Sequence, residues 1–163
     1  MSGMPMLNAI WSEFIQPIMR RPSRYQVAAL CFRRDGERLE ILLITSLETR
    51  RWILPKGWPK TGFDAGGVAL EEAWEEAGVK PRGGKPRLIG RYRYDKRLRG
   101  GIPLPTDVDV FAIETEKLYD TYPEVGRRER RWMSPQDAAE AVDEPELKDL
   151  LANADELLAV SSR

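Results

Sequence analysis

Two short apolar runs near the start of the chain predict a β-hairpin. Residues 25–33 and 39–46 are rich in β-branched residues and leucine, and each has the length of a typical strand. The residues between them include Asp35-Gly36, a dipeptide typical of tight hairpin turns. We therefore expect the two runs to pair in a sheet.

Further strands are indicated later in the chain. Residues 52–54 form a brief apolar run that stops at Pro55-Lys56-Gly57. Two longer strands are predicted at residues 87–94 and 107–115, with a loop rich in glycine and proline at 100–105 between them.

Helical patterns occupy the middle and the end of the chain. Residues 65–77 form one candidate helix, and Gly78 suits the left-handed position that follows a helix. Ser134-Pro135 supplies a cap and a first-turn proline for a second helix, and residues 144–160 continue with a leucine-rich stripe. This order of strands and helices predicts an α+β domain, in which helices pack on a mixed or antiparallel sheet.

The composition limits the kinds of catalysis and metal binding that the chain can perform. The 163 residues include 26 basic and 26 acidic side chains, so no overall charge draws the chain to nucleic acid or to an anionic membrane. The chain has no histidine and one cysteine, which excludes histidine-based catalysis, internal disulfides and the usual zinc sites. No segment has the ~20 apolar residues of a membrane span. We expect a cytoplasmic protein whose proton transfer and metal binding depend on carboxylates.

Charges of one sign gather in separate segments. Residues 91–99 carry five basic residues and one acid, and residues 127–131 carry four and one. Residues 61–79 carry five acids and no lysine or arginine. A basic segment beside a metal site can bind several adjacent phosphates, whereas a solvated surface is the alternative for both basic segments.

The predicted helix at 65–77 has an unusual acidic face. At ~100° per residue, its apolar residues fall on one side and its four glutamates on the other (Glu71, Glu72, Glu75 and Glu76). Like charges at these spacings destabilise a helix by ~0.2–0.5 kcal/mol per pair. We expect a neutralising partner from outside the helix, and hard divalent cations are suited to oxygen ligands. An exposed acidic face is the alternative.

Residues 57–79 resemble the Nudix box, which is a glycine, five residues, a glutamate, seven residues, and then Arg-Glu-apolar-any-Glu-Glu-any-Gly-apolar. Seven positions fall in register: Gly57, Glu72, Ala73, Glu75, Glu76, Gly78 and Val79. The flanking residues 51–57 and 132–138 are also similar to the family's usual surroundings.

The resemblance implies a Nudix-type fold, a mixed β-sheet flanked by helices in an α/β/α sandwich. We expect the Nudix hydrolase domain to cover residues 25–142. Residues 1–24 would form an N-terminal extension with a short helix, and residues 143–163 a C-terminal helix packed on the domain.

Two positions depart from the family pattern. Phe63 stands where the first glutamate is expected, and Glu71 stands where the arginine is expected. In the family these two residues normally pair and brace the loop against the helix. Phe63 could brace the loop by packing, and either Asp64 or Glu71 could offer a substitute carboxylate.

The resemblance also implies roles for the glutamates. Glu72 and Glu76 would ligate Mg²⁺ (or Mn²⁺), assisted by a backbone carbonyl near Lys56 and Gly57, and Glu75 would act as the base that orients or deprotonates water. This chemistry suits phosphoanhydride hydrolysis, which needs a cation to neutralise oxygens and a positioned water.

Within the family, the chain is most similar to the diphosphoinositol polyphosphate and diadenosine polyphosphate phosphohydrolases. The candidate substrate-binding residues are basic: Arg24, Arg51, Lys56, Lys96, Arg97, Arg99 and Arg128. Relatives that take inositol pyrophosphates carry a basic stretch after the first-strand tyrosine, whereas Tyr25 here is followed by Gln26-Val27-Ala28.

Dinucleoside polyphosphates, other nucleoside diphosphate derivatives and polyphosphate therefore remain open as substrates, and Trp58 is a candidate to stack on a base. We expect a small phosphorylated substrate, no nucleic-acid partner, and a monomer or homodimer. The alternative is a non-catalytic Nudix-fold module that binds phosphorylated ligands.

Overall fold

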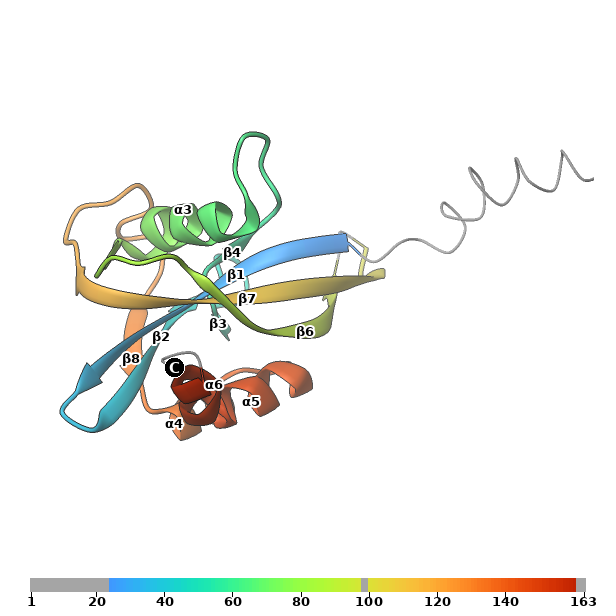
Figure 1. Ribbon diagram of the computed structural model, residues 1–163. Helices are drawn as coiled ribbons and strands as arrows, with labels where there is room; N and C mark the ends of the chain where they lie inside the picture. Colours follow the sequence, from blue (N-terminus) through green and yellow to red (C-terminus); the bar gives the residue numbers. More distant parts are fainter. Residues whose placement is uncertain (1–23, 98–99, 161–163) are drawn as a thin grey trace, which may run out of the picture.

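The computed structural model describes residues 24–97 and 100–160 (Figure 1). The short helix expected within residues 1–24 and the candidate residue Arg99 lie outside the described residues. Among the described residues, no helix is long and apolar enough to cross a membrane.

The sheet is built around a central buried strand, β1 (Arg24–Asp35). It forms the predicted antiparallel hairpin with β2 (Arg38–Thr45). On the other side, β1 pairs in parallel with β7 (Pro103–Leu118), and β7 then pairs antiparallel with β6 (Arg87–Arg97) and β5 (Val79–Pro81). The sheet is therefore mixed, with one parallel pair among antiparallel ones. Parallel neighbours require a crossover connection, and a helix lies in the chain between β1 and β7.

Three short strands complete the sheet. β3 (Trp52–Ile53) and β8 (Arg130–Met133) both pair antiparallel with β2. β4 (Lys56–Gly57) pairs antiparallel with Ala28 and Val27 of β1. The sequence predicted that residues 55–57 end the preceding strand. In the structure, two of them form a further short strand that pairs with β1.

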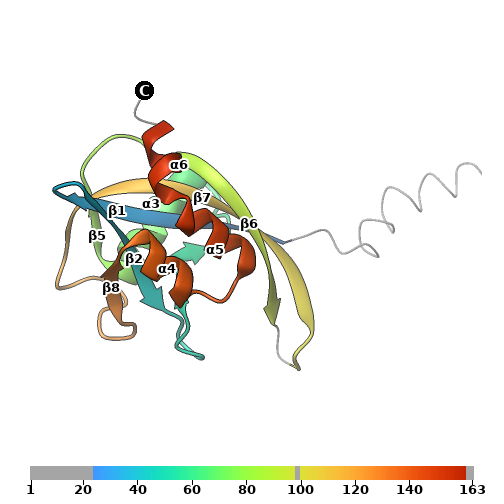
Figure 2. The ribbon, with the colours of Figure 1, turned by 90° about the horizontal axis from the view of Figure 1, so that it is seen from below.

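Helices cover both faces of the sheet (Figures 1 and 2). α3 (Ala65–Ala77) lies on one face, over a core cluster that includes Val27, Ala29, Val68 and Ala73. The helices α4 (Pro135–Ala141), α5 (Pro145–Ala152) and α6 (Ala154–Val160) lie on the other face. Their apolar side chains pack against the alternate residues of β1, such as Ala28 and Leu30. The predicted α/β/α sandwich is confirmed.

Several element ends differ from the sequence prediction. The strands predicted at 87–94 and 107–115 are longer, because their ladder continues as far as Arg97 opposite Pro103. The single helix predicted at 144–160 is two helices that break at Asn153. The Asn153 side-chain Nδ2 donates to the Asp149 carbonyl at 2.8 Å, and such side-chain bonds compete with continued helix.

Both ends of α3 agree with the sequence. Asp64 caps the N-terminus, where its Oδ1 accepts from Gly67 N at 2.7 Å. Gly78 ends the helix in the left-handed conformation with φ 66°, and its N–H donates to the carbonyls of Ala73 and Trp74. A Cβ on Gly78 would lie 2.5 Å from Cδ1 of Tyr122.

Gly78→Ala is therefore expected to lower the free energy of unfolding by roughly 3 kcal/mol, from the left-handed backbone plus the overpacked ring. Gly36→Ala is the matched control, because Gly36 has φ 65° and a Cβ added there would have no atom within 4 Å. Urea denaturation measures the free energy of unfolding of both variants. An equal decrease in the two would show that the contact with Tyr122 carries no cost.

Candidate active site

Two buried glutamates of α3 lie against the short strand β4. Glu72 and Glu76 are 6% and 7% exposed. Glu76 Oε2 accepts from the Lys56 backbone N–H at 3.2 Å. A Cβ on Gly57 would lie only 2.3 Å from Glu72 Oε1, so the glycine lets this carboxylate approach the backbone. The structure thus brings together four of the residues that the Nudix resemblance singles out.

A lysine from the preceding loop neutralises part of the acidic face. Lys60 Nζ lies 2.9 Å from Glu72 Oε1, 3.1 Å from Glu71 Oε1 and 3.7 Å from Glu75 Oε2. Its hydrogen bonds to Glu72 and Glu71 raise the Lys60 pKa above its ordinary value despite some burial. Lys60 thus neutralises part of the acidic face from within the chain, and the divalent cation expected there stays a prediction.

Phe63 and Glu71, the two residues that depart from the family pattern, have different surroundings in the structure. Phe63 is 51% exposed and does not belong to the core. Asp64 is occupied as the cap of α3. Glu71 binds Lys60 through Oε1, whereas its Oε2 is buried without a hydrogen-bond partner. The loop and helix are thus joined by an ion pair of reversed polarity, with the base on the loop and the acid on the helix.

Glu75 occupies the partly open side of the helix. Burial raises its pKa, the neighbouring carboxyl of Glu71 raises it further, and Lys60 opposes this shift. Its side chain is 35% exposed, so it reaches solvent while its neighbour Glu72 does not. A carboxylate with a raised pKa at such a border can accept a proton from water more readily than an ordinary one.

Glu76 lies deeper, beside Arg128. Burial raises the pKa of Glu76 to about 8, although the Arg128 guanidinium opposes the shift. Arg128 Nη2 lies 3.5 Å from Glu76 Oε1, and the same guanidinium binds Glu124 and the Thr45 carbonyl. Arg128 is only 8% exposed, so it is fixed beside the acidic helix rather than free on the surface.

Other arginines of the basic segment 127–131 also hold the fold together. Arg130 donates to the carbonyls of Ala77 and Tyr119, both at 2.9 Å. Arg131 lies over the Trp52 ring at 4.9 Å. This segment therefore ties the loop after β7 to the end of α3.

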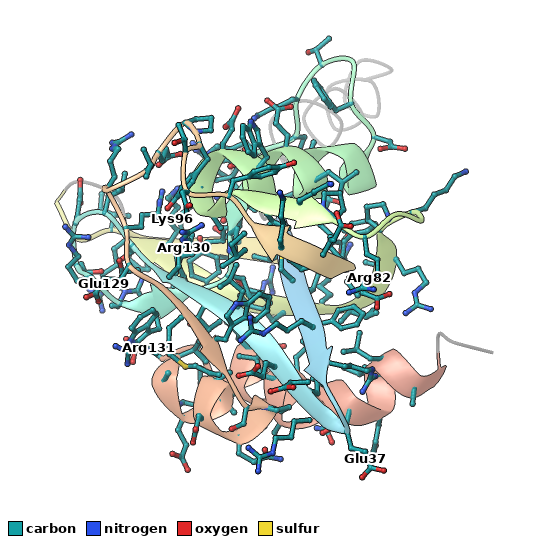
Figure 3. The ribbon with its side chains drawn as sticks, turned by 90° about the vertical axis from the view of Figure 1, so that its left-hand side faces the viewer. Glu37, Arg82, Lys96, Glu129, Arg130 and Arg131 are labelled. Atoms are coloured by element: carbon teal, nitrogen blue, oxygen red, sulfur yellow. The ribbon has the colours of Figure 1, made fainter. Side chains whose placement is uncertain are left out.

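The basic end of β6 surrounds an aromatic side chain. Lys96 and Arg24 lie 4.6 and 5.6 Å from the Trp58 ring, which is 36% exposed. Burial, and then the nearby Arg24, lower the pKa of Lys96. Arg97 is exposed at the end of the strand. In Figure 3, Lys96 is well separated from Glu37, which lies at the tip of the β1–β2 hairpin.

A second group of charged residues, made of Arg51, Asp143 and Glu144, lies near Lys56. Burial lowers the pKa of Lys56 to about 8, and Glu76 and Glu144 oppose the shift. Lys56 Nζ lies 5.5 Å from the Tyr94 ring. Arg51 Nη1 contacts Glu144 Oε1 at 3.1 Å and Asp143 Oδ2 at 3.8 Å.

Sequence reasoning missed Lys60, Tyr94 and Glu144. The absence of a base within the acidic helix could have directed attention to Lys60 in the flanking loop. Glu144 has no comparable local signal, because its partner Arg51 lies 93 positions away.

The donor set around Glu72 and Glu76 fits a hard divalent cation. It offers carboxylate oxygens next to the backbone of β4, and a cation, Lys60, already lies against it. In the described part of the chain, no three His, Cys, Asp or Glu side chains form a ready-made metal cage.

Comparisons with known proteins agree with this architecture. A family model described as NUDIX domain matches residues 23–154. Diphosphoinositol polyphosphate phosphohydrolase 3-beta of Bos taurus is 36% identical over 116 residues, which cover 69% of this chain and 65% of that protein. Diphosphoinositol polyphosphate phosphohydrolase 2 of Mus musculus is 34% identical over 120 residues, covering 73% and 63%. The chain thus spans less than two thirds of these relatives.

Solved structures show the same fold. A C. elegans Ap4A hydrolase matches with a TM-score of 0.65 and 20% identity, over 84% of this chain and 99% of that one. The NUDIX domain of Shewanella oneidensis NrtR, solved with ADP ribose, matches with a TM-score of 0.63 and 16% identity, over 92% and 97%.

Proposed function

This chain belongs to the NUDIX family, and on that premise we propose that it hydrolyses a phosphoanhydride bond of a polyphosphorylated small molecule with the help of Mg²⁺. The observation that carries the proposal is the burial of Glu72 and Glu76 against Lys56 and Gly57. Buried carboxylates are costly, and Lys60 and Arg128 offset part of that cost here. A divalent cation held by the two glutamates would offset more of it.

Each residue of the site has a proposed task. Glu72 and Glu76 would hold the metal together with a carbonyl near Lys56 and Gly57. The bound metal would neutralise phosphate oxygens. Glu75, at the border with solvent, would orient a water and accept its proton. Lys56, which is half-buried, would bind a phosphate from the other side of β4, where its ammonium lies 5.5 Å from the Tyr94 ring.

The basic end of the sheet supports a substrate that carries several phosphates. Arg24 and Lys96 flank the half-exposed Trp58, which suits phosphates attached to a stackable group. The curated relatives are named for diphosphoinositol polyphosphates and one structural neighbour for Ap4A. We propose that the substrate belongs to one of these classes or is another nucleoside diphosphate derivative.

A release assay tests the proposal directly. Purified protein is incubated with Mg²⁺ or Mn²⁺ and with a dinucleoside tetraphosphate, a diphosphoinositol polyphosphate, ADP-ribose or inorganic tripolyphosphate. We expect metal-dependent turnover of at least one of them. Binding without turnover of any substrate would favour a non-catalytic module instead.

Lys60→Gln is expected to tighten Mg²⁺ binding by at least about threefold, because the lysine competes with the metal for Glu72 Oε1 and adds local positive charge. Isothermal titration of the substrate-free protein measures this without turnover. Lys80→Gln, which removes an exposed pair with Glu116, is the matched control. Weaker Mg²⁺ binding would mean that the Lys60–Glu71 brace matters more than the competition.

Replacing Lys96 and Arg97 together with serine is expected to raise KM for polyphosphorylated substrates by about tenfold, because phosphate contacts are charge-assisted. The KM of a short diphosphate substrate, which has fewer phosphates to contact these residues, should change much less. Lys85→Ser serves as a control on an exposed lysine elsewhere. Equal effects on both substrates would make this end a solvated surface only.

A further inference from the structure

A separate cavity of about 920 Å³ lies at the edge of the sheet, where the chain leaves β8 and enters α4. It is lined by residues 38–40 of β2, residues 131–133 of β8, Trp52 and side chains of α4. None of the residues given a catalytic or substrate-binding task above lines it. A ligand of this cavity would therefore be distinct from the proposed substrate.

Inside this cavity, β2 extends beyond its neighbour β8. The two strands pair only as far as Ile41 opposite Met133. Continuing the same register would place residue 135 opposite Leu39. That residue is Pro135, which has no N–H and begins α4 instead of prolonging the strand. The outer edge of β2 at Leu39 therefore has no strand beside it.

Leu39 turns its backbone groups toward this outer edge. A two-residue turn joins β1 to β2, so Arg38 and Glu40 direct their N–H and C=O groups toward β1. The groups of Leu39, between them, point to the other side, where no described strand pairs with them. An unpaired donor and acceptor at a sheet edge can pair with another extended chain.

Acidic side chains surround this edge. Five carboxylates and two guanidiniums line the cavity. Glu40 pairs with Arg33 at 3.0 Å, and Arg131 lies over the Trp52 ring. The other four carboxylates, here called the acidic rim, have no ion pair with any residue that the structure describes: Glu37, Asp137, Glu140 and Asp155. An occupant with several positive charges complements this cavity, whereas phosphates do not.

Helix stability does not account for the whole acidic rim. Asp137 and Asp155 lie in the first turns of α4 and α6, where the helix dipole favours an acid. Glu140 lies in the last turn of α4, where a negative charge is unfavourable. Lys148 donates to the carbonyl oxygens of Ala139 and Glu140, not to this carboxylate. The Glu140 carboxylate thus remains available to a cation from outside the chain.

A strand added at Leu39 would turn every second side chain toward the acidic rim. Three of the four rim residues come from α4 and α6, which lie on the same face of the sheet (Figures 1 and 2). Successive side chains of a strand point to opposite faces of its sheet. The added strand would therefore carry its basic side chains at alternate positions.

We propose that this cavity docks an extended basic segment of a partner protein, which pairs with β2 at Leu39 and directs alternate lysine or arginine side chains to the acidic rim. Backbone pairing supplies affinity, and the charges supply specificity, as in other cases of strand addition to a sheet edge. The docking does not depend on the proposed hydrolysis, because the cavity and the acidic helix involve different residues.

A blocked, fluorescein-labelled heptapeptide of alternating lysine and valine tests the proposal by fluorescence anisotropy. We expect saturable binding to the full chain and none of the matching glutamate–valine peptide. Glu37→Lys combined with Glu140→Lys should weaken binding at least about tenfold with an unchanged Tm. Glu48→Lys combined with Asp120→Lys is the matched control, because it changes the net charge equally at exposed residues outside the cavity. It should shift the affinity less than about twofold.

Absence of binding at millimolar lysine–valine peptide, or equal weakening in the control, overturns the proposal. If the variant with two lysines does not fold, Glu37→Gln combined with Glu140→Gln should still weaken binding at least about threefold. Sedimentation of the wild type identifies the remaining occupant. A dimer that the peptide dissociates would assign the cavity to a second copy of this chain and not to a partner.

Two N-methylated versions of the peptide separate strand pairing from charge attraction. Alternate N–H groups of a strand face opposite edges, so methylating either the lysine or the valine nitrogens blocks one edge only. One version should bind at least about tenfold more weakly, and the other as well as the parent peptide. The same affinity for both versions, or equally tight binding of spermine, which has the charges but no amides, overturns strand addition.

Discussion

Glu76→Gln is expected to lower kcat/KM by at least roughly 100-fold, about 2.7 kcal/mol of lost transition-state stabilisation. The amide has nearly the same shape, so its oxygen can still accept from the Lys56 N–H. It carries no charge, however, and presents a donor that cannot ligate a metal. The fold should survive, because burial already disfavours the charged form of this side chain.

Steady-state kinetics and a thermal melt of the same preparation test this expectation. Glu116→Gln is the control, since Glu116 is an exposed glutamate paired with Lys80. Turnover within about threefold of the wild type, with an unchanged Tm, would contradict the proposed role of Glu76 as a ligand.

Gly57→Ala is expected to lower kcat/KM by at least roughly 30-fold, about 2 kcal/mol, while the fold is kept. The new methyl group would lie 2.3 Å from Glu72 Oε1 and 2.4 Å from its Cδ, so the carboxylate must leave its place. A misplaced ligand loses far more activity than stability, because catalysis depends on positions within about half an ångström.

Gly66→Ala provides the comparison within the same motif. Gly66 lies in the first turn of α3, and the nearest atom to its added Cβ would be 3.5 Å away. Replacing a helical glycine there should stabilise the protein by roughly 0.5–1 kcal/mol and leave kinetics unchanged. If both variants keep full activity, Glu72 does not need its present position.

The helix at the centre of the site could be predicted well from the sequence. Its bounds at 65–77 and the left-handed Gly78 followed from the helical spacing and the glycine at the end. The predicted separation of an apolar side from an acidic side was wrong, because Glu72 and Glu76 are buried beside Ala73 whereas Trp74 is 38% exposed. The strand ends could not be predicted, because the β6–β7 ladder extends beyond the apolar residues and depends on the facing backbone.

The contacts within the site were harder to anticipate than its carboxylates. Spacing placed all four glutamates on one face, and the Nudix resemblance selected Glu72 and Glu76 as metal ligands. Both are buried against β4, and their role as ligands stays a prediction. The same spacing says nothing of Lys60, whose loop must fold back over the helix. Nor does it indicate that Arg51 and Glu144, far apart in sequence, meet beside Lys56.

The parallel pairing of β1 with β7 has a consequence for how the chain folds. Nine residue pairs join the two strands, from Arg24 opposite Thr106 to Phe32 opposite Glu114. Partners so distant in sequence give a high contact order, which slows folding. During synthesis the β1–β2 hairpin can form early, yet one edge of its most buried strand stays unpaired until residues 103–118 have been made. An unpaired apolar strand edge is a template for aggregation, so the nascent chain is most vulnerable in that interval.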